Sequence, residues 1–319
     1  MRMWSLASLL VIGCGDKDDT DTAADTDTGE SSTADMGGAA PLAELSSGEC
    51  PDMSSSGLTS TFLSSGDERT VTLIYPSDTD QDMSMVFFFH GLLDPGHTEQ
   101  PTAYMADALN AQRLADDLGA VIVMPQSPIQ DYLGFQFFLW NVEQGTSESD
   151  LVLYDDLRTC MKQQFDTIDL DRVSAMGFSG GSLFATIVAG ERGDTLASLV
   201  EMSGGADLEV VIADNFLAPY TTPASTMPSL LVTGGTNDVW PSASLTVVDF
   251  VDGTDTLEAH LVGDGHFTVR CRHDRGHTIT NAELELAIDW SQAHTYETAS
   301  PYETDGLGGD ADWCEVVSQ

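Results

Sequence analysis

The sequence is poor in basic residues, and this scarcity limits the partners that the protein can bind. Only 11 of its 319 residues are Lys or Arg, against 52 Asp or Glu, so the formal net charge is -41 at pH 7. Such a charge repels the phosphate groups of nucleic acids and of anionic lipids. We therefore expect no nucleic acid partner, and we attribute the acidic surface to solubility outside the cell.

Long apolar runs are also missing, and the apolar stretch at the N-terminus is short. Residues 1–14 read MRMWSLASLLVIGC, with a basic residue near the start and a small residue before Cys14. A membrane-spanning helix needs about 20 apolar residues, so this stretch is typical of an export signal. Its last four residues resemble the lipobox of bacterial lipoproteins, in which the cysteine carries lipid. The resemblance implies a signal peptide at residues 1–13 and a lipid anchor at Cys14, with an ordinary secretory signal as the alternative.

Residues 14–48 form an acidic segment with almost no large apolar side chains. A segment of this composition cannot bury a core, so we expect it to stay disordered. Behind a lipid anchor it would tether an exported protein to a bacterial membrane, in the periplasm or at the cell surface. The remaining residues 49–319 number about 270, which is a usual size for one α/β domain.

Cysteine is scarce, and its spacing argues against a metal site. The sequence has five cysteines, none in a CxxC pair, and its histidines do not gather around them. We therefore expect no metal. With Cys14 assigned to the anchor, an even number remains in an exported chain, which predicts two disulfides. The remaining cysteines are Cys50, Cys160, Cys271 and Cys314.

Short apolar runs alternate with helix-length stretches along the rest of the chain. The runs typical of buried strands are 71–75, 85–89, 120–124, 173–178, 197–202, 230–233 and 267–271. The stretches with apolar residues three or four apart, which predict helices, are 101–118, 151–165, 181–192 and 281–294. This alternation predicts an α/β fold with a mostly parallel sheet and helices on both faces.

Ser179 lies where one of these strands is followed at once by a helix. The sequence is RVSAMGFSGGSLFATIVAG, with Gly177 two residues before the serine and Gly181 two residues after it. In a mostly parallel sheet, ligands gather at the carboxyl ends of the strands. A tight turn from strand to helix is crowded there, and glycines relieve the crowding while the serine hydroxyl stays accessible. The pattern indicates a nucleophilic serine.

Three further features occur in the order that an acyl-transfer site requires. The run FFFHGLLDPG ends an early strand, and the N–H of Leu92 there would form an oxyanion hole with the N–H of Gly180. Asp238 follows a later strand in LLVTGGTNDVWP, and His277 follows the last strand in FTVRCRHDRGHTIT. Ser, Asp and His in this order along the chain is the order of the α/β-hydrolases.

Other residues compete for two of these roles. His266, in GDGHF, is the alternative to His277 as the base, although it would begin the last strand rather than follow it. Asp249 and Asp252 are the alternatives to Asp238, because no clear secondary structure is visible around them.

Two aromatic residues near the motifs are candidates for substrate binding. His90 is more consistent with a turn residue that lines the oxyanion loop than with a base, because the base in this fold follows the acid along the chain. Trp140, in FQFFLWNVEQG, either lines an acyl pocket or packs under a long loop.

Residues 70–294 resemble the α/β-hydrolases, and more narrowly the bacterial polyhydroxybutyrate depolymerase and feruloyl esterase group. The resemblance rests on FFFHG, DLDRVSAMGFSGGSLFATIVA, SGG, GGTNDVWP and RGHTI, which together span most of the domain. The chain departs from the family pattern at Gly180, where Ala or Asn is common, and at Thr280, where Pro commonly follows shortly after GHT. These departures affect the assignment to a subfamily more than the assignment of the catalytic chemistry.

The resemblance implies a serine carboxylic ester hydrolase that works through an acyl-serine and needs no cofactor. Ser179 would be the nucleophile, His277 the base, and Asp238 the acid that orients the base. The expected substrates are short-chain esters, feruloyl or acetyl esters, or hydroxyalkanoate oligomers. A serine peptidase of the same fold and a non-catalytic surface binding protein are the alternatives, and the oligomeric state is left open.

The same resemblance orders the cysteines in space. In an α/β-hydrolase sheet the first and last strands lie at opposite edges, so Cys50 would be far from Cys271. A bridge from Cys160, near the middle of the sheet, to Cys271 would span several strands, beyond the Cα limit of about 7 Å. The resemblance therefore implies the pairs Cys50–Cys160 and Cys271–Cys314.

Overall fold

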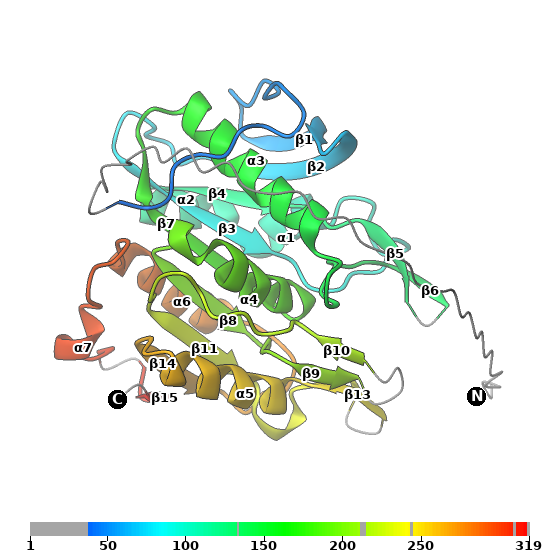
Figure 1. Cartoon of the computed structure of the whole chain (residues 1–319), viewed down its shortest axis with the longest axis vertical. Coiled ribbons are helices and arrows are strands. Elements are labelled where there is room, and N and C mark those ends of the chain that lie inside the picture. The colour runs from blue at the N-terminus through cyan, green and yellow to red at the C-terminus, as the bar shows by residue number, and fades with distance from the viewer. Residues whose placement is uncertain (1–37, 133, 211–214, 243–244, 309–310, 318–319) are drawn as a thin grey trace, which may run out of the picture. The chain divides into compact units, whose positions relative to one another are not determined.

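The centre of the fold is a sheet whose inner strands are parallel (Figure 1). The computed structural model describes residues 38–132, 134–210, 215–242, 245–308 and 311–317. The strand order is β1-β2-β4-β3-β7-β8-β11-β14-β15, with parallel pairs from β4 to β14 and antiparallel pairs at both edges. The strands are β1 Gly57–Ser64, β2 Asp67–Ile74, β3 Met83–Phe89, β4 Ala120–Pro125, β7 Ile168–Phe178, β8 Ser198–Met202, β11 Ser229–Thr233, β14 Thr268–Arg272 and β15 Cys314–Val316.

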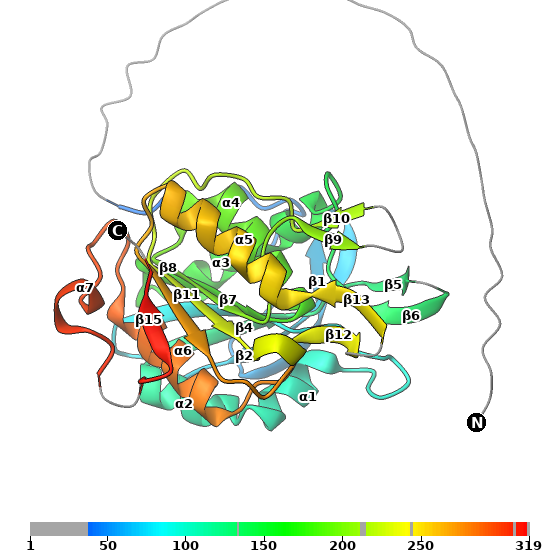
Figure 2. The ribbon, with the colours of Figure 1, turned by 90° about the horizontal axis from the view of Figure 1, so that it is seen from below.

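Helices cover both faces of this sheet. Figures 1 and 2 show α3, α4 and α5 on one face and α1, α2 and α6 on the other. Within the described residues, no helix is both long and apolar enough to cross a membrane. The helices are α1 Pro101–Ala108, α2 Ala111–Leu118, α3 Glu148–Gln164, α4 Gly180–Arg192, α5 Phe250–Gly263, α6 Asn281–Ala293 and α7 Tyr302–Asp305, with 3₁₀ turns at Gly193–Thr195 and Gly235–Asn237.

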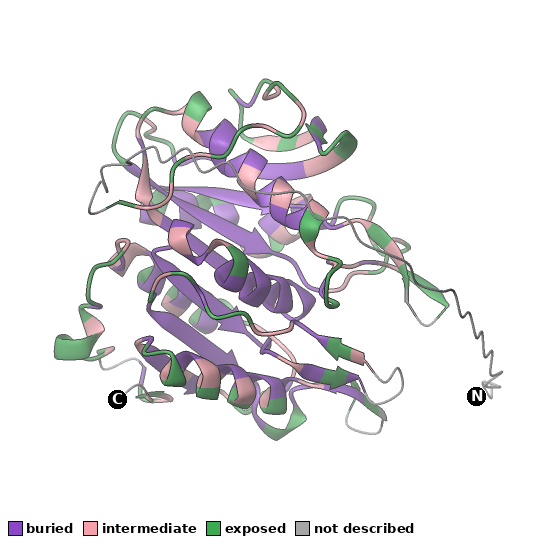
Figure 3. Cartoon of the chain, in the orientation of Figure 1, coloured by how far each residue is buried: buried purple, intermediate pink, exposed green. Residues whose placement is uncertain are grey.

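The central strands are buried on both faces, as Figure 3 shows. In β3, with the sequence MSMVFFF, every residue is buried. Phe87 belongs to the core that includes Phe184 of α4, whereas its neighbour Phe88 belongs to the core that includes Ile288 of α6. Because successive side chains of a strand point to opposite faces, a strand covered on both faces is apolar throughout. The strands therefore appear in the sequence as continuous apolar runs.

Small hairpins lie at the end of the sheet where the parallel strands have their carboxyl ends (Figures 1 and 2). Each pairs two short antiparallel strands. Their strands are β5 Ile129–Tyr132, β6 Phe135–Phe138, β9 Leu208–Val210, β10 Asn215–Leu217, β12 Val239–Ser242 and β13 Leu245–Asp249.

The strands and helices expected from the sequence are present, although the structure also has elements that were not expected, among them the edge strands β1 and β15 and the small hairpins. The stretch 101–118 is divided into α1 and α2, because Asn110 adopts a left-handed conformation with φ 51°. In addition, β12, β13 and α5 occupy a region where the sequence showed no clear element.

The domain begins earlier than the composition suggests. We expected disorder through residue 48, but residues 38–48 lie against the domain. The N–H of Ser46 donates to Oδ1 of buried Asp156 (2.9 Å), and the guanidinium of buried Arg158 donates to the carbonyls of Ala40 (2.6 Å) and Pro41 (3.2 Å). Backbone groups make most of these contacts, and composition does not reveal them. The expected linker boundary is therefore wrong, while residues 1–37, which include the expected signal peptide and anchor, lie outside the described residues.

Two disulfides join distant parts of the chain. Cys50–Cys160 ties the N-terminal segment to α3 with a Cα separation of 5.5 Å. Cys271–Cys314 ties β14 to β15 with a Cα separation of 4.0 Å. These are the pairs that the α/β-hydrolase resemblance implied.

A chain that begins at residue 49 should be less stable than one that begins at residue 38. Its Asp156 and Arg158 would lose their partners in residues 40–46, and a buried polar group left without a partner costs about 1–3 kcal/mol. We expect the shorter chain to unfold at a clearly lower urea concentration, while the slope of its free energy of unfolding against urea concentration stays unchanged. Equal midpoints would show that the segment contributes nothing to stability.

Candidate active site

Ser179 occupies a strained turn between β7 and α4. Its backbone has φ 57° and ψ -126°, a conformation that non-glycine residues rarely adopt. A Cβ added at Gly181 would overlap the carbonyl of Phe89, and one added at Gly177 would overlap the backbone of Gly181. The glycines on either side of the serine are therefore required by close backbone contacts. The N–H of Ser179 donates to the carbonyl of Met202 (3.0 Å), which holds the turn against β8.

Three side chains form a hydrogen-bonded chain that ends at the hydroxyl of Ser179. Nε2 of His277 lies 2.9 Å from Oγ of Ser179, and Nδ1 lies 2.7 Å from Oδ1 of Asp238. When the serine hydroxyl donates to Nε2, the ring proton is on Nδ1 and donates to the carboxylate. The arrangement gives the imidazole the tautomer that can accept a proton from Ser179.

Asp238 is fully buried just after β11 and is held by further donors. Its Oδ2 accepts hydrogen bonds from Oγ of Ser203 (2.8 Å) and from the N–H of Gly234 (2.7 Å). All of these partners donate, so they suit an ionised carboxylate. Ser203 is the first residue of the SGG motif at residues 203–205, and nothing in the sequence indicated this contact.

Aromatic rings hold the imidazole of His277 in place. The ring stacks between Phe178 of β7, with centroids 4.9 Å apart, and Phe250 of α5, with centroids 4.3 Å apart. A ring clamped on both faces can turn little, so its two nitrogens stay directed at Ser179 and Asp238. Neither aromatic residue was expected at the site from the sequence, although Phe178 lies directly before the serine.

The N–H groups of Leu92 and Gly180 lie beside Ser179. Both residues line the same pocket as the serine, and a Cβ added at Gly180 would lie 3.7 Å from the nitrogen of Leu92. The loop passes close over the turn, because a Cβ at Gly91 would lie 3.1 Å from Cβ of Ser179. Among the described residues, neither N–H donates to an acceptor. Two free donors next to the hydroxyl, one of them at the N-terminus of α4, can hold a developing negative charge.

His90 does not contact the pocket, which corrects its assignment as a substrate-binding candidate. It is fully buried, and its Nε2 accepts the N–H of Ser127 (3.2 Å) while Nδ1 donates to the carbonyl of Gly91 (2.7 Å). Burial lowers the pKa of His90 to about 4, so the ring is neutral at pH 7. The ring fixes the loop that carries Leu92.

Trp140 lines the pocket but exposes only 1% of its surface. Its indole N–H donates to the carbonyl of His90 (2.9 Å), and its ring stacks on Phe184 with centroids 4.7 Å apart. Its main role is therefore to support the same loop.

The alternative base and acids lie away from Ser179. His266 is buried near the start of β14, where its Nδ1 accepts the N–H of Met227 (3.0 Å). Asp249 caps the N-terminus of α5 by accepting the N–H of Val251 (3.0 Å), and Asp252 is exposed on that helix. The geometry favours His277 and Asp238 over all three.

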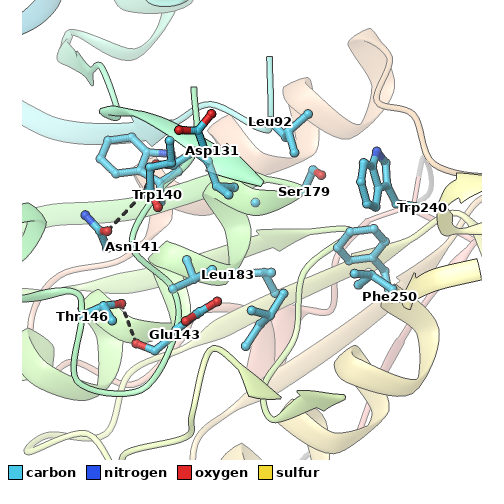
Figure 4. A pocket seen from close by; sticks show the side chains of 16 residues that line it. Leu92, Asp131, Trp140, Asn141, Glu143, Thr146, Ser179, Leu183, Trp240 and Phe250 are labelled. Carbon is cyan, nitrogen blue, oxygen red and sulfur yellow. Dashed lines mark hydrogen bonds between the residues drawn. The ribbon is translucent and has the colours of Figure 1, made fainter. Parts of the chain in front are cut away.

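Two hollows flank Ser179. The first, shown in Figure 4, has a volume of about 290 Å³, and its apolar wall includes Leu183, Val248 and Phe250. The second, of about 390 Å³, lies on the side of His277 and has apolar walls from α1 and α6. A substrate whose reacting carbon sits at Ser179 can therefore extend in two directions.

No protein-family model matches the chain, and no curated protein matches it. Solved structures do match. A structure described as native sOPH has a TM-score of 0.65 at 16% identity and covers 84% of this chain and 96% of its own, and native pOPH has a TM-score of 0.64 with the same identity and coverage. An S-formylglutathione hydrolase from Agrobacterium tumefaciens has a TM-score of 0.52 at 18% identity, covering 71% of this chain and 90% of its own. At these identities the likeness concerns the fold, and the chain has the α/β-hydrolase fold.

Proposed function

We propose that the protein is a serine carboxylic ester hydrolase that forms an acyl-enzyme on Ser179. The observation that carries the proposal is the hydrogen-bonded chain from Ser179 through His277 to Asp238, beside two free backbone donors. A solved structure that shares the fold is an S-formylglutathione hydrolase, and another is titled a thermostable esterase.

The geometry suits two successive acyl transfers. His277 takes the proton of Ser179 as Oγ attacks the ester carbonyl, and Asp238 stabilises the imidazolium that forms. The N–H groups of Leu92 and Gly180 stabilise the oxyanion, worth about 3 kcal/mol per donor. His277 then protonates the leaving alcohol, and a water that it activates releases the acid and restores the serine.

The position of His277 supports a separate hollow for each half of the ester. The imidazole must reach the leaving oxygen to protonate it, and it lines only the second hollow. The alcohol would therefore occupy the second hollow and the acyl chain the first. A first hollow of about 290 Å³ suits short-chain, acetyl, feruloyl or hydroxyalkanoate acyl groups.

Replacing Ser179 with Ala should abolish ester hydrolysis while leaving the fold intact. We expect a loss on the order of 10⁶-fold in kcat for p-nitrophenyl butyrate, because the triad acts as a unit. His277→Ala should be nearly as inactive, whereas His266→Asn, which keeps an acceptor for the N–H of Met227, should retain activity. Activity of Ser179→Ala within tenfold of wild type would overturn the enzymatic proposal.

The same substrate separates the alternative functions. A burst of p-nitrophenol equal to the enzyme concentration indicates an acyl-enzyme, which a non-catalytic binding protein cannot form. A serine peptidase of this fold would also cleave peptide amides, so a matched amide that stays intact while the ester is cleaved favours the esterase.

The acyl pocket has acidic but no basic side chains in the wall that the structure describes. Asp131 and Glu143 line it, and among the described residues no Lys or Arg lines either hollow. Figure 4 shows the carboxylate of Glu143 on the pocket side of its loop, across from Ser179. A substrate whose acyl chain ends in a carboxylate would bring two like charges together there.

We therefore expect discrimination against acyl groups that end in a carboxylate. With six-carbon acyl groups on one phenol, kcat/KM should be lower for a carboxylate end than for a methyl or ammonium end. Glu143→Gln should raise the relative rate of the carboxylate ester about two- to fivefold, since the group is exposed, and added salt should shrink the difference. Glu315→Gln, which removes the same charge on β15, serves as the control. Unchanged ratios in Glu143→Gln would contradict this role.

Membrane tethering through Cys14 is part of the same proposal. The lipobox-like sequence at the N-terminus supports it, and the two disulfides suit an exported protein, since disulfides persist in oxidising compartments. Residues 14–37 would then link the anchor to the domain.

Replacing Cys14 with Ser should release the protein from the membrane fraction or block its maturation. Acyl chains contribute about 0.8 kcal/mol for each CH₂ they bury, and the acidic domain offers no other attraction to lipid. Ser179→Ala, which leaves the N-terminus unchanged, should stay with the membranes. A Cys14→Ser protein that is still membrane-bound after salt washing would defeat the proposal.

A further inference from the structure

Glu201 is a fully buried acidic residue beneath the nucleophile turn, and no cation among the described residues pairs with it. It lies on β8, is 0% exposed and has Gly177 of β7 and Leu231 of β11 as its neighbours in the sheet. An ionised carboxylate in such a place would be costly, because burial removes its hydration and no opposite charge replaces it.

Three hydrogen-bonding groups contact its two oxygens. Oε2 accepts from Oγ of Ser182 (2.9 Å) and from the N–H of Gly205 (2.9 Å). Oε1 lies 2.7 Å from Oγ1 of Thr186, and that same Oγ1 lies 3.0 Å from the carbonyl oxygen of Gly205. The hydroxyl of Ser182 in turn accepts the N–H of Met202 (2.9 Å).

Counting protons shows which form of Glu201 this arrangement suits. Thr186 has one hydroxyl proton but two oxygens within reach, Oε1 of Glu201 and the carbonyl of Gly205. If Glu201 is ionised, Thr186 donates to it, and the carbonyl of Gly205 loses the one donor described for it. If Oε1 carries a proton, it donates to Thr186, and Thr186 donates to Gly205. Every group is then satisfied.

In the part of the chain that the structure describes, the surroundings of Glu201 contain no positive charge that would favour its ionisation. β11 carries no charged residue, and β7 carries its charged residues in its first five positions, at the other end from Gly177. Asp238 and His277 form no hydrogen bond with Glu201. Burial raises the pKa of Glu201 to about 8. α4 and α5 are the helices on this face of the sheet. Their titratable side chains lie at a helix end, are exposed to solvent or pair with other residues. They are Glu191, Arg192, Asp252, Asp255, Glu258 and His260.

The residues that follow Glu201 make direct contacts with the candidate catalytic groups. The carbonyl of Met202 accepts the N–H of Ser179 (3.0 Å), and Oγ of Ser203 donates to Asp238 (2.8 Å). Gly204 fits because a Cβ there would collide with Oε2 of Glu201 and with the side chain of Ser182. The carboxyl group therefore lies where it can fix both the nucleophile turn and the residue that orients Asp238.

We propose that Glu201 is a neutral carboxylic acid that positions the loop of residues 202–205, and through it Ser179 and Asp238. Its proton belongs to the native network, with Glu201 donating to Thr186 and Thr186 donating to Gly205. Its effect on catalysis rests on the proposed esterase function, whereas its protonation does not.

Stability measured against pH tests the protonation without any substrate. Glu201→Gln mimics the neutral acid, since its amide N–H can donate to Thr186 while its oxygen accepts from Ser182 and Gly205. In the unfolded wild type, Glu201 loses its proton above about pH 4.5, whereas in the native protein it keeps the proton until about pH 8. The free energy of unfolding of the wild type therefore falls between these two pH values. The Tm of Glu201→Gln should equal that of wild type at about pH 4, exceed it by a growing margin from about pH 4.5 to pH 8, and exceed it by a constant margin at higher pH.

Two outcomes would overturn the neutral form. One is a Glu201→Gln protein that is less stable than wild type at pH 7, while the exposed control Glu315→Gln is not. The other concerns the infrared spectrum of the wild type. At pH 7 we expect the carbonyl band of a protonated carboxylic acid, and this band should disappear when the pH is raised past 8. Absence of that band would contradict the proposal even if Glu201→Gln failed to fold.

Activity tests the positioning role. Glu201→Gln should keep the wild-type kcat at pH 6 to 7, and its activity should persist to higher pH than that of wild type. Glu201→Ala should lose about ten- to a hundredfold in kcat with little change in KM, because a small displacement of the triad slows chemistry more than binding. A kcat for Glu201→Ala equal to that of wild type would exclude positioning. An inactive wild type with the expected Tm profile and infrared band would instead refute the esterase proposal alone.

Discussion

The close approach of backbones at the turn between β7 and α4 is the constraint on which the rest of the site depends. Ser179 keeps its strained φ of 57° only because Gly177 and Gly181 allow the turn to press against the end of β3. The same compression places the N–H of Gly180 at the start of α4 and next to the loop that carries Leu92. Strand, helix and loop therefore meet at one point, and a larger residue at either glycine would separate them.

The carboxyl ends of β8 and β11 hold the remaining groups in register with that turn. Met202 binds the backbone of Ser179, and the next residue, Ser203, binds Asp238, so one short segment contacts both ends of the triad. His277 lies between them, clamped by Phe178 and Phe250. Because packing as well as hydrogen bonds fixes each side chain, the site is organised before any substrate arrives.

The sequence could predict the parts of the site that have a local signal. Buried parallel strands appear as apolar runs, and the residue after each run lies at the sheet edge where sites form, so Ser179, Asp238 and His277 could be placed in advance. Phe250 could not, because its contact with His277 depends on how β12, β13 and α5 fold back over the sheet. The packing of residues 38–48 also carried no signal, since their backbone groups satisfy buried side chains of α3. His90 looked accessible in the sequence, but its ring lies inside the loop that it supports.

Three acidic residues near Ser179 show how the surroundings, rather than the residue type, determine what a carboxyl group does. Asp238 is buried among hydrogen-bond donors and beside an imidazole, an arrangement that suits the role of the acid in the proposed mechanism. Glu201 is equally buried but faces hydroxyl groups that can accept a proton as well as donate one, which suits a neutral acid. Glu143 is exposed and lines the pocket, where its carboxyl group faces an incoming substrate rather than the interior. The chain has a net charge of -41, yet among the described residues of the proposed site the only buried carboxylate next to the imidazole is that of Asp238. A neutral Glu201 would keep a second negative charge out of this buried region.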